Sequence, residues 1–453
     1  MSASPDTIRF NAVDRYYLIP ETADLDGSYF PMLVCGGVEL SQPLERAQVV
    51  EGFKRMHARF PAFRLGYQLD YRVDRWRKVP TSELDAHFEQ LVQSGPEMSI
   101  ENAVAEAVRA NIMPLSCPIQ ATIYGNRLTL RSHHSFTDGN FGLKLLAHLI
   151  VAAFDPDAYD RLPDISMQYG LPIWRIAWDT PRQGLTMLWN WIRTFKSSVT
   201  DYKGTGEIVG YSPELIRNGS PVSVMRCILP RSTMTAIGRV RRELSKETPI
   251  TLNTLFQVII AHRLIELDIL PSDQLVEYTQ PIDLQHYKRD SVIYAGNLAG
   301  QVRLKIMPRD LRTDSIEFQT KLEANLDSGL PLATLPSEWL LAATGRRFYK
   351  KINRDWLASS IRTDARFFVF SNLGILDSDF KLALPFITSQ TQLALSGSLI
   401  GAPPLLILLG ILGGEGHLTL TYNPRVLAPA QIEQIAGAFS PQWLEQQLQI
   451  EKA

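Results

Sequence analysis

The sequence predicts a mixed α/β protein built from two units of similar make-up. Its 453 residues are too many for one compact core, because chains of this length usually divide into domains. Hydrophobic residues make up 45% and charged residues 21%, which is typical of a globular chain and not of a disordered one. Strand-like and helix-like segments occur in both halves, so we expect each half to supply its own strands and helices.

In the first half, apolar residues recur at helical spacing in three segments, and three others have the pattern of strands. We predict helices over residues 44–60, 99–110 and 141–154. We predict strands over residues 67–79, 119–124 and 127–131, with a tight turn between the last two.

The second half repeats this mix without a literal sequence repeat. We predict strands over residues 223–229, 277–283, 300–306 and 366–370, and a hairpin of residues 405–412 and 417–422 around a glycine-rich turn. We predict helices over residues 251–267 and 429–450.

Proline, glycine and aspartate accumulate between the two halves, as expected of a connector. We therefore predict an N-terminal unit over residues 1–180, a connector over 181–215 and a C-terminal unit over 216–453. Within the connector, residues 185–195 (LTMLWNWIRTF) are a tryptophan-rich helix candidate, which either packs against one domain or contacts an acyl chain or a membrane surface.

Charge and composition exclude several classes of protein. Lysine and arginine number 46 against 47 aspartates and glutamates, so the basic excess of a nucleic-acid-binding protein is missing. The first 20 residues lack a signal-peptide pattern, and the longest strongly apolar run, 403–412, is too short to span a bilayer. Three widely spaced cysteines offer neither a metal-binding pair nor a disulfide framework. We expect a cytoplasmic protein that is not transmembrane.

One short motif carries candidate chemistry: His133-His134-Ser135-Phe136-Thr137-Asp138-Gly139, between a predicted strand and an apolar helix. A neutral imidazole accepts a proton near neutral pH, as general-base catalysis requires. A carboxylate four residues later can hold the loop in shape, and a glycine lets backbone and substrate approach closely.

This HHxxxDG motif resembles that of the CoA-dependent acyltransferase superfamily. The superfamily includes chloramphenicol acetyltransferase, wax ester synthases, alcohol acetyltransferases and the condensation domains of non-ribosomal peptide synthetases. The resemblance implies that His134 is the general base, His133 its supporting partner, Asp138 mainly structural and Gly139 the position of close approach. It also implies two chloramphenicol-acetyltransferase-like subdomains in a V, with a tunnel between them in which an acyl thioester and a nucleophile meet.

Four further segments resemble the family more loosely. Residues 56–64 are similar to its early helix and following strand, residues 251–255 to the start of a helix in its second half, and residues 294–297 to the segment before its crossover strand. Ser371-Asn372-Leu373-Gly374 resembles a Ser-Asn-x-Gly stretch of the lipid and alcohol branches. Ser371 and Asn372 are therefore candidates for substrate binding, although a strand-end cap is an equal alternative.

One segment departs from the family pattern. Many members have an arginine that pairs with the motif aspartate, at the end of a Pro-x-Asp-x-Arg-like stretch. Here Gln285 occupies that position. Either Gln285 hydrogen-bonds Asp138, or Lys288 or Arg289 takes the role.

A basic cluster at Arg346, Arg347 and Lys350, continued by Lys351 and Arg354, has two interpretations. It is either a solvated helix face or a contact for a phosphate of CoA, for carrier-bound phosphopantetheine or for an acidic carrier protein.

Taken together, these features predict an acyltransferase that moves an acyl group from a CoA or carrier-bound thioester to an alcohol or amine. We expect no metal and no tightly bound cofactor: adjacent histidines point apart in an extended segment, and no cysteine or glutamate completes a ligand set with Asp138. Ser371 and Ser396 lack the surroundings of a serine hydrolase nucleophile.

The sequence shows no adenylation or carrier region, so we expect a stand-alone transferase and favour CoA as donor. The alternative is a non-catalytic condensation-like module that recruits a carrier or partner protein.

Overall fold

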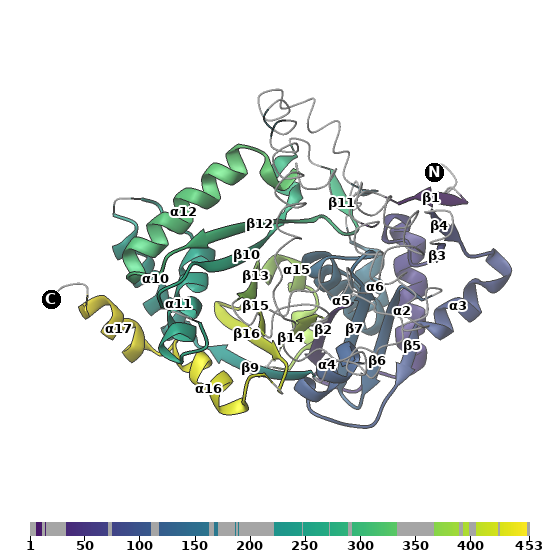
Figure 1. Cartoon of the computed structure of the whole chain (residues 1–453). Coiled ribbons are helices and arrows are strands. Elements are labelled where there is room, and N and C mark those ends of the chain that lie inside the picture. The colour runs from purple at the N-terminus through teal and green to yellow at the C-terminus, as the bar shows by residue number, and fades with distance from the viewer. Residues whose placement is uncertain are drawn as a thin grey trace.

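Two large sheets organise the protein (Figure 1). A computed structural model describes residues 6–10, 14, 33–70, 75–109, 117–162, 167–170, 186, 189, 222–246, 248–270, 272–288, 292–332, 367–388, 393–397, 405–424 and 426–450. Among these residues, no helix is both long enough and apolar enough to cross a membrane.

The first sheet has five strands in the order β14-β2-β7-β6-β5. Their bounds are Leu33–Glu39 (β2), Val92–Ser94 (β5), Ile119–Tyr124 (β6), Arg127–His133 (β7) and Ala394–Gly397 (β14). Strand β14 comes from the second half of the chain and pairs antiparallel with β2. The first sheet is therefore completed by a segment outside the predicted N-terminal unit, whose boundaries stay a prediction.

Helices cover both faces of this sheet. Adjacent residues of a strand face opposite sides. Gly36 faces Leu143 of α5 (Gly139–Phe154), whereas Gly37 faces Val104 of α4 (Ile100–Arg109). A third helix, α2 (Arg46–Arg59), packs beside α5. These helices agree with the predicted ones to within two residues at either end.

The second sheet has six strands in the order β12-β10-β13-β15-β16-β9. Their bounds are Ser223–Leu229 (β9), Val276–Asp283 (β10), Ala299–Ile306 (β12), Phe367–Ile375 (β13), Leu405–Leu412 (β15) and Glu415–Tyr422 (β16). The predicted hairpin is present as β15 and β16, and Gly413 and Gly414 turn it with φ angles of 61° and 77°. Both angles lie in the left-handed region that favours glycine.

Five helices accompany the second sheet, namely α10 (Arg231–Leu244), α11 (Leu252–Glu266), α12 (Leu311–Asp327), α16 (Pro429–Gly437) and α17 (Pro441–Ile450). Two predictions for this half are wrong. The last helix is two helices, because Pro441 starts a new one and the Ser440 hydroxyl accepts the N–H of Trp443 at its beginning. The predicted strand 366–370 continues to Ile375, which places Ser371 and Asn372 inside β13.

Two small sheets lie beside the large ones. One orders its strands β1-β4-β3 and the other pairs β11 with β8. Their bounds are Thr7–Arg9 (β1), Tyr67–Asp70 (β3), Arg75–Lys78 (β4), Met167–Tyr169 (β8) and Ile293–Ala295 (β11). Shorter helices are α3 (Leu84–Gln90), α6 (Pro156–Asp160), α15 (Asp377–Phe380) and the 3-10 turn η3 (Leu284–Tyr287).

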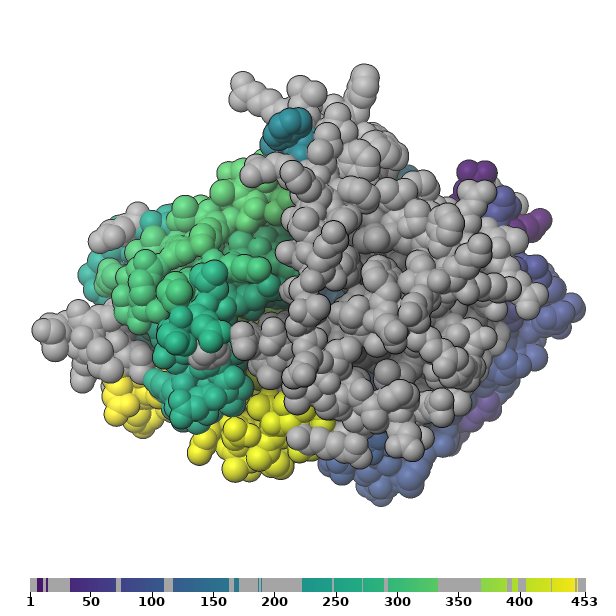
Figure 2. Space-filling model, in the orientation of Figure 1, coloured from purple at the N-terminus to yellow at the C-terminus, as the bar shows by residue number. Residues whose placement is uncertain are grey.

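Each large sheet has its own hydrophobic core. One core combines residues of α2, α5 and the first sheet, including Leu395 of β14. The other combines α11, α12 and the second sheet, all from residues after 228. In the space-filling view, most of the described surface of the first half lies on one side of the molecule and most of that of the second half on the other (Figure 2). Two units with separate cores were predicted, and this prediction is confirmed.

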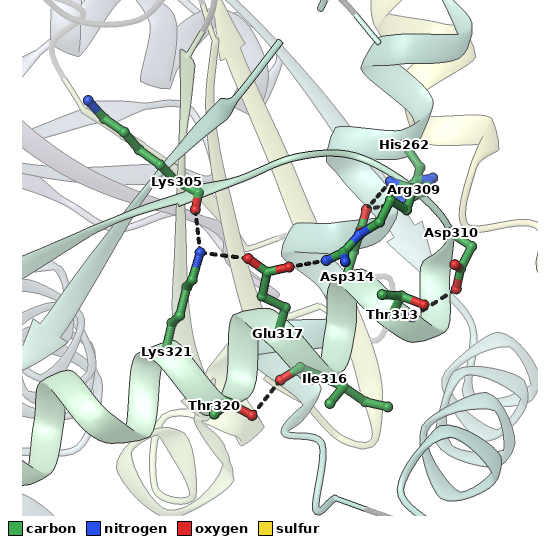
Figure 3. Close-up of polar contacts among 10 residues, drawn as sticks. All are labelled: His262, Lys305, Arg309, Asp310, Thr313, Asp314, Ile316, Glu317, Thr320 and Lys321. Carbon is green, nitrogen blue, oxygen red and sulfur yellow. Dashed lines mark hydrogen bonds and ion pairs between the residues drawn. The ribbon is translucent and has the colours of Figure 1, made fainter. Parts of the chain in front are cut away.

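The buried carboxylate of Asp314 on α12 contacts His262 on α11 in the second unit (Figure 3). Asp314 is fully buried, and its Oδ2 lies 2.9 Å from His262 Nε2 on α11 and accepts the backbone N–H of Arg309 at 3.1 Å. Glu317, one turn along α12, pairs with Arg309 and, at 2.6 Å, with Lys321. Oδ2 of the buried carboxylate thus has hydrogen-bond partners, and Arg309 Nε lies 3.6 Å from Oδ1 as an ion-pair partner.

Candidate functional site

The HHxxxDG motif forms the turn between β7 and α5. Strand β7 runs to His133, which is fully buried, and its carbonyl accepts the N–H groups of Phe136 at 2.8 Å and Thr137 at 3.2 Å. This tight turn brings the chain back so that α5 begins at Gly139. The two histidines diverge as a result: His133 faces the interior, while His134 is only partly buried and lines a cavity.

Asn297, on the loop before β12, holds the His134 ring. The Asn297 amide nitrogen lies 2.7 Å from His134 Nδ1 and 2.5 Å from the His134 carbonyl oxygen. The amide oxygen accepts the N–H of Ala299 at 3.0 Å, which fixes which end of the fully buried Asn297 amide faces the histidine. The ring orientation is therefore set by a residue of the second unit.

The His134 imidazole is neutral at physiological pH. Burial lowers its pKa to about 4, and a hydrogen bond to its own backbone carbonyl opposes this effect in part. A neutral imidazole has one unprotonated ring nitrogen, and that nitrogen can accept a proton.

Asp138 connects the two units through backbone groups. Its Oδ1 accepts the N–H of Phe141 at 2.8 Å and so caps α5, and its Oδ2 accepts the N–H of Leu298 at 2.9 Å. Burial, and secondarily the charge of Asp283, raise the pKa of Asp138 to about 6. The two backbone N–H groups and Lys144 oppose that rise. In the described residues, backbone N–H groups thus occupy both oxygens of this carboxylate.

A fully buried arginine supports the same turn from behind. Arg64 Nη2 donates to the carbonyl of Phe136 at 2.7 Å, and its guanidinium stacks on the rings of Trp76, Phe136 and Tyr169 at 4.4, 4.8 and 4.0 Å. Burial lowers the pKa of Arg64 to about 10, so the group stays charged. Asp14, at 3.9 Å, is its ion-pair partner.

Arg64 also reaches the loop that carries Asn297. A Cβ at Gly296 would lie 3.1 Å from Arg64 Nη2, and the φ of Gly296 is 111°. Glycine is therefore required there both by the backbone conformation and by the approach of the guanidinium. One buried cation consequently contacts the loops on both sides of His134.

A cavity of about 250 Å³ opens beside His134, between the two large sheets. Its walls come from β2, β7, β14 and the start of α5 on one side, and from β10, β12, β13 and β15 on the other. His134, Asp138 and Gly139 line it together. A Cβ at Gly139 would lie 3.0 Å from Leu373, so this glycine permits the close packing of α5 against β13.

The remaining predicted site residues lie in different places. Ser371 lines the cavity, whereas Asn372 uses its side-chain oxygen to accept the N–H of Gly374 at 2.8 Å. Gln285 lies in η3, and no contact of its side chain with Asp138 is present among the described residues. The ammonium of Lys288 donates to the carbonyl of Val292 at 2.6 Å. The residues Arg289, Arg346, Arg347 and Lys350, and the connector except Thr186 and Trp189, lie outside the described residues.

No group of three or more histidine, cysteine or acidic side chains suited to a metal ion is found in the described part of the chain. The Cys35 thiol lines the cavity, and burial raises its pKa to about 12, which keeps it in the unreactive neutral form.

Two contributors to the site were not predicted from the sequence. Asn297 belongs to a segment that the sequence marks only by a loose resemblance, and Arg64 ends another such segment. An arginine within a largely apolar stretch and an Asn after a glycine are weak signals, because both occur often in ordinary loops.

Solved structures of other proteins resemble the chain over nearly its whole length. Trichothecene 15-O-acetyltransferase TRI3 from Fusarium sporotrichioides matches with a TM-score of 0.61 and 14% identity, over 97% of this chain and 95% of that one. Polyketide synthase associated protein 5 from Mycobacterium tuberculosis matches with a TM-score of 0.57 and 13% identity, over 95% and 96%. The first condensation domain of the calcium-dependent antibiotic synthetase matches with a TM-score of 0.61 and 13% identity, over 98% and 96%.

No protein-family model and no curated protein matches the sequence. The structural matches cover nearly the whole of this chain and of each compared chain, so both units are shared. The protein therefore has the chloramphenicol-acetyltransferase-like fold of acyltransferases and condensation domains, as the HHxxxDG resemblance implied.

Proposed function

We propose that the protein is an acyltransferase that transfers an acyl group from a thioester to an alcohol or amine. The observation that carries this proposal is the placement of a neutral His134, held through Nδ1, in the wall of a cavity between the two units. General-base catalysis requires a neutral imidazole within reach of a bound nucleophile. The shared fold, in which TRI3 is named an acetyltransferase, supports the same class of reaction.

In the proposed reaction, the hydroxyl or amine of the acceptor attacks the thioester carbonyl carbon while the unprotonated ring nitrogen of His134 accepts its proton. A tetrahedral intermediate forms, and its collapse breaks the carbon–sulfur bond. The histidine returns the proton to the departing thiolate, so the products are an ester or amide and a free thiol. Asp138 holds the turn and takes no part in the proton transfer, since its carboxylate oxygens accept backbone N–H groups.

The donor is proposed to be acyl-CoA or an acyl group on a carrier-bound phosphopantetheine arm, with no metal or redox cofactor. The first condensation domain of the calcium-dependent antibiotic synthetase, which has the same fold, is known in complex with a substrate analogue. In this proposal, the cavity beside His134 is part of a tunnel between the two units. The tunnel opens on both faces of the molecule, so that donor and acceptor enter from opposite sides.

Thiol release tests this proposal. The protein is incubated with acyl-CoA or an acyl carrier protein, with and without a panel of alcohols and amines, and the free thiol and the acylated product are measured. We expect thiol release that depends on the acceptor and equals the product formed. If acyl donors bind but no acceptor supports release, the protein is a non-catalytic module that recruits its partner.

A further inference from the structure

We propose that the cavity beside His134 binds an uncharged hydrocarbon group of a substrate, and that Gly142 determines how large this group can be. This inference rests on the proposed acyl transfer and names the class of substrate for it.

The cavity wall is formed mostly by apolar side chains and glycines from both units. The apolar lining side chains are Leu33, Val34, Leu130, Leu143, Pro281, Ala299, Val369, Leu373, Leu395, Leu406 and Leu408. Two of the lining hydroxyls already bond to other hydroxyls: Ser132 to Thr137, and Ser396 to Thr421 at 2.8 Å. Such a wall favours a group that gains free energy by leaving water.

The charges in the wall disfavour an anionic group. The ionisable residues among the described lining residues are His134, Asp138 and Cys35. The histidine and the thiol are neutral at physiological pH, and Asp138 binds backbone N–H groups with both oxygens. A carboxylate or phosphate would lose its water without meeting a positive charge, which is strongly unfavourable.

Gly142 lies in the first turn of α5 and lines the cavity. A Cβ there would lie 3.4 Å from Thr137 Oγ1 and 4.0 Å from Val34 Cγ2, which are ordinary van der Waals distances. Alanine therefore fits at this position without moving its neighbours, and its methyl group stands in the cavity wall beside Val34, another lining residue.

The other lining glycines are less suitable for this change. A Cβ would lie 3.2 Å from Leu143 at Gly36, 3.0 Å from Leu373 at Gly139, 2.8 Å from Leu284 at Gly300 and 3.2 Å from Leu406 at Gly397. A substitution at those positions must displace a packed side chain, whereas Gly142→Ala only reduces the space left for a ligand.

A matched control lies in the second unit. Gly238 is inside helix α10, and no atom lies within 4 Å of its Cβ position. Gly142→Ala and Gly238→Ala each replace a helical glycine with a better helix former, so both should raise stability slightly. Only the first changes the cavity.

The hydrocarbon group could belong to the acyl donor or to the acceptor, and two arms of one experiment distinguish them. In the first arm, kcat/KM is measured with straight-chain acyl-CoAs from acetyl to decanoyl and a fixed acceptor. In the second, 1-alkanol acceptors of increasing length are used with a fixed donor. For the wild type, we expect kcat/KM to rise about fourfold per methylene in one arm until the cavity is full, and then to level off or fall.

Gly142→Ala should move that maximum to a shorter chain, and Gly238→Ala should leave it unchanged. Within the arm that responds, replacing the terminal methyl group by a carboxylate, as in succinyl-CoA against butanoyl-CoA, should lower kcat/KM by at least about a hundredfold. A chain-length profile that is flat in both arms, or the same profile for Gly142→Ala and the wild type, overturns the inference, as does equal use of the charged analogue.

Binding measured without turnover separates this inference from the proposed function. Titration calorimetry with 1-alkanols and acyl-CoAs should show affinity that increases with chain length and is reduced for long chains by Gly142→Ala. If this binding pattern is found without thiol release, the proposed function fails and the hydrocarbon site stands. If thiol release occurs without any dependence on chain length, the function stands and the hydrocarbon site is wrong.

Discussion

Asn297 and His134 meet although 162 residues separate them in the sequence, and their contact fixes the histidine ring. Asn297→Ala should remove the two amide contacts and lower kcat about fivefold with little change in KM, because one hydrogen bond is worth about 1 kcal/mol. The acid limb of kcat, expected near the His134 pKa of about 4, should also shift. Asn325→Ala on α12 serves as control, and equal kinetics for the two variants would contradict the positioning role.

Asp138 makes the stability of the protein depend on pH. Its pKa is about 6 in the folded protein against 3.8 in the unfolded chain, so folding favours the protonated form. The resulting stabilisation is fully present below pH 3.8 and is lost as the pH rises through 6. Relative to Asp138→Asn, which cannot titrate, the wild type should gain about 1 kcal/mol of unfolding free energy between about pH 7.5 and about pH 5.

Urea unfolding of both proteins at each pH measures this difference. An identical pH dependence for the wild type and Asp138→Asn would mean that Asp138 has an ordinary pKa and that its burial does not disfavour the carboxylate.

The sequence predicts the motif residues of the site but not the protein groups that contact them. His134, Asp138 and Gly139 all line the cavity, because their spacing fits a turn between a strand and a helix. The group that meets Asp138 from the second unit is the backbone N–H of Leu298 and not a side chain. Any residue except proline can supply a backbone N–H, so no residue type in the sequence marks this contact.

At the scale of elements, Arg64 joins the turn before α5 to the loop before β12. Arg64→Lys keeps the charge but loses the planar stacking on three rings and the geometry of the Phe136 contact. We expect a lower melting temperature and, well below it, a kcat reduced more than KM is raised. The acid limb of kcat should move as well, which a purely structural defect would not cause.

Arg55→Lys is the control for that substitution, since Arg55 pairs with Asp160 at the surface at 3.0 Å. If Arg64→Lys lowers the melting temperature while kcat, KM and the pH profile stay as in the wild type, Arg64 only stabilises the fold.

Most helices and strands follow from the sequence, because their apolar residues recur at the period of a helix or a strand. The errors arise where a local signal competes with this pattern. Ser440-Pro441 is a helix start inside an apolar periodic stretch, and it divides the predicted last helix. Strand β14 has four residues, too few for a periodic pattern, and its place in the first sheet depends on a partner far away in the sequence.

At the scale of the whole molecule, the two units were predictable and the space between them was not. Composition and length predict a core for each unit, and each large sheet has one. The cavity forms where the side chains of the two sheets do not fill the space between them. Its presence therefore depends on how the two sheets are placed relative to each other. The spacing of residues along a strand predicts which face of its sheet a residue occupies. It does not predict which residues of the other sheet face it.

Delivery of the donor is also a property of the whole molecule. If the predicted basic cluster contacts CoA phosphates, the combined change Arg346→Ala, Arg347→Ala and Lys350→Ala should raise KM for acyl-CoA about tenfold, with kcat unchanged. Docking of an acidic carrier protein would instead give a KM that rises steeply with ionic strength. Arg239→Ala with Arg242→Ala, two exposed arginines of α10, is the control. No effect with either donor would identify the cluster as a solvated face.

The most direct test of the central claim is the turnover of His134→Ala with the best donor and acceptor pair. General-base catalysis predicts that kcat falls by about 10²–10⁴ while the melting temperature and donor affinity stay near those of the wild type. His133→Ala should reduce kcat less, and His286→Ala, at an exposed position outside the cavity, should leave it unchanged. Near-normal turnover by His134→Ala would contradict the account.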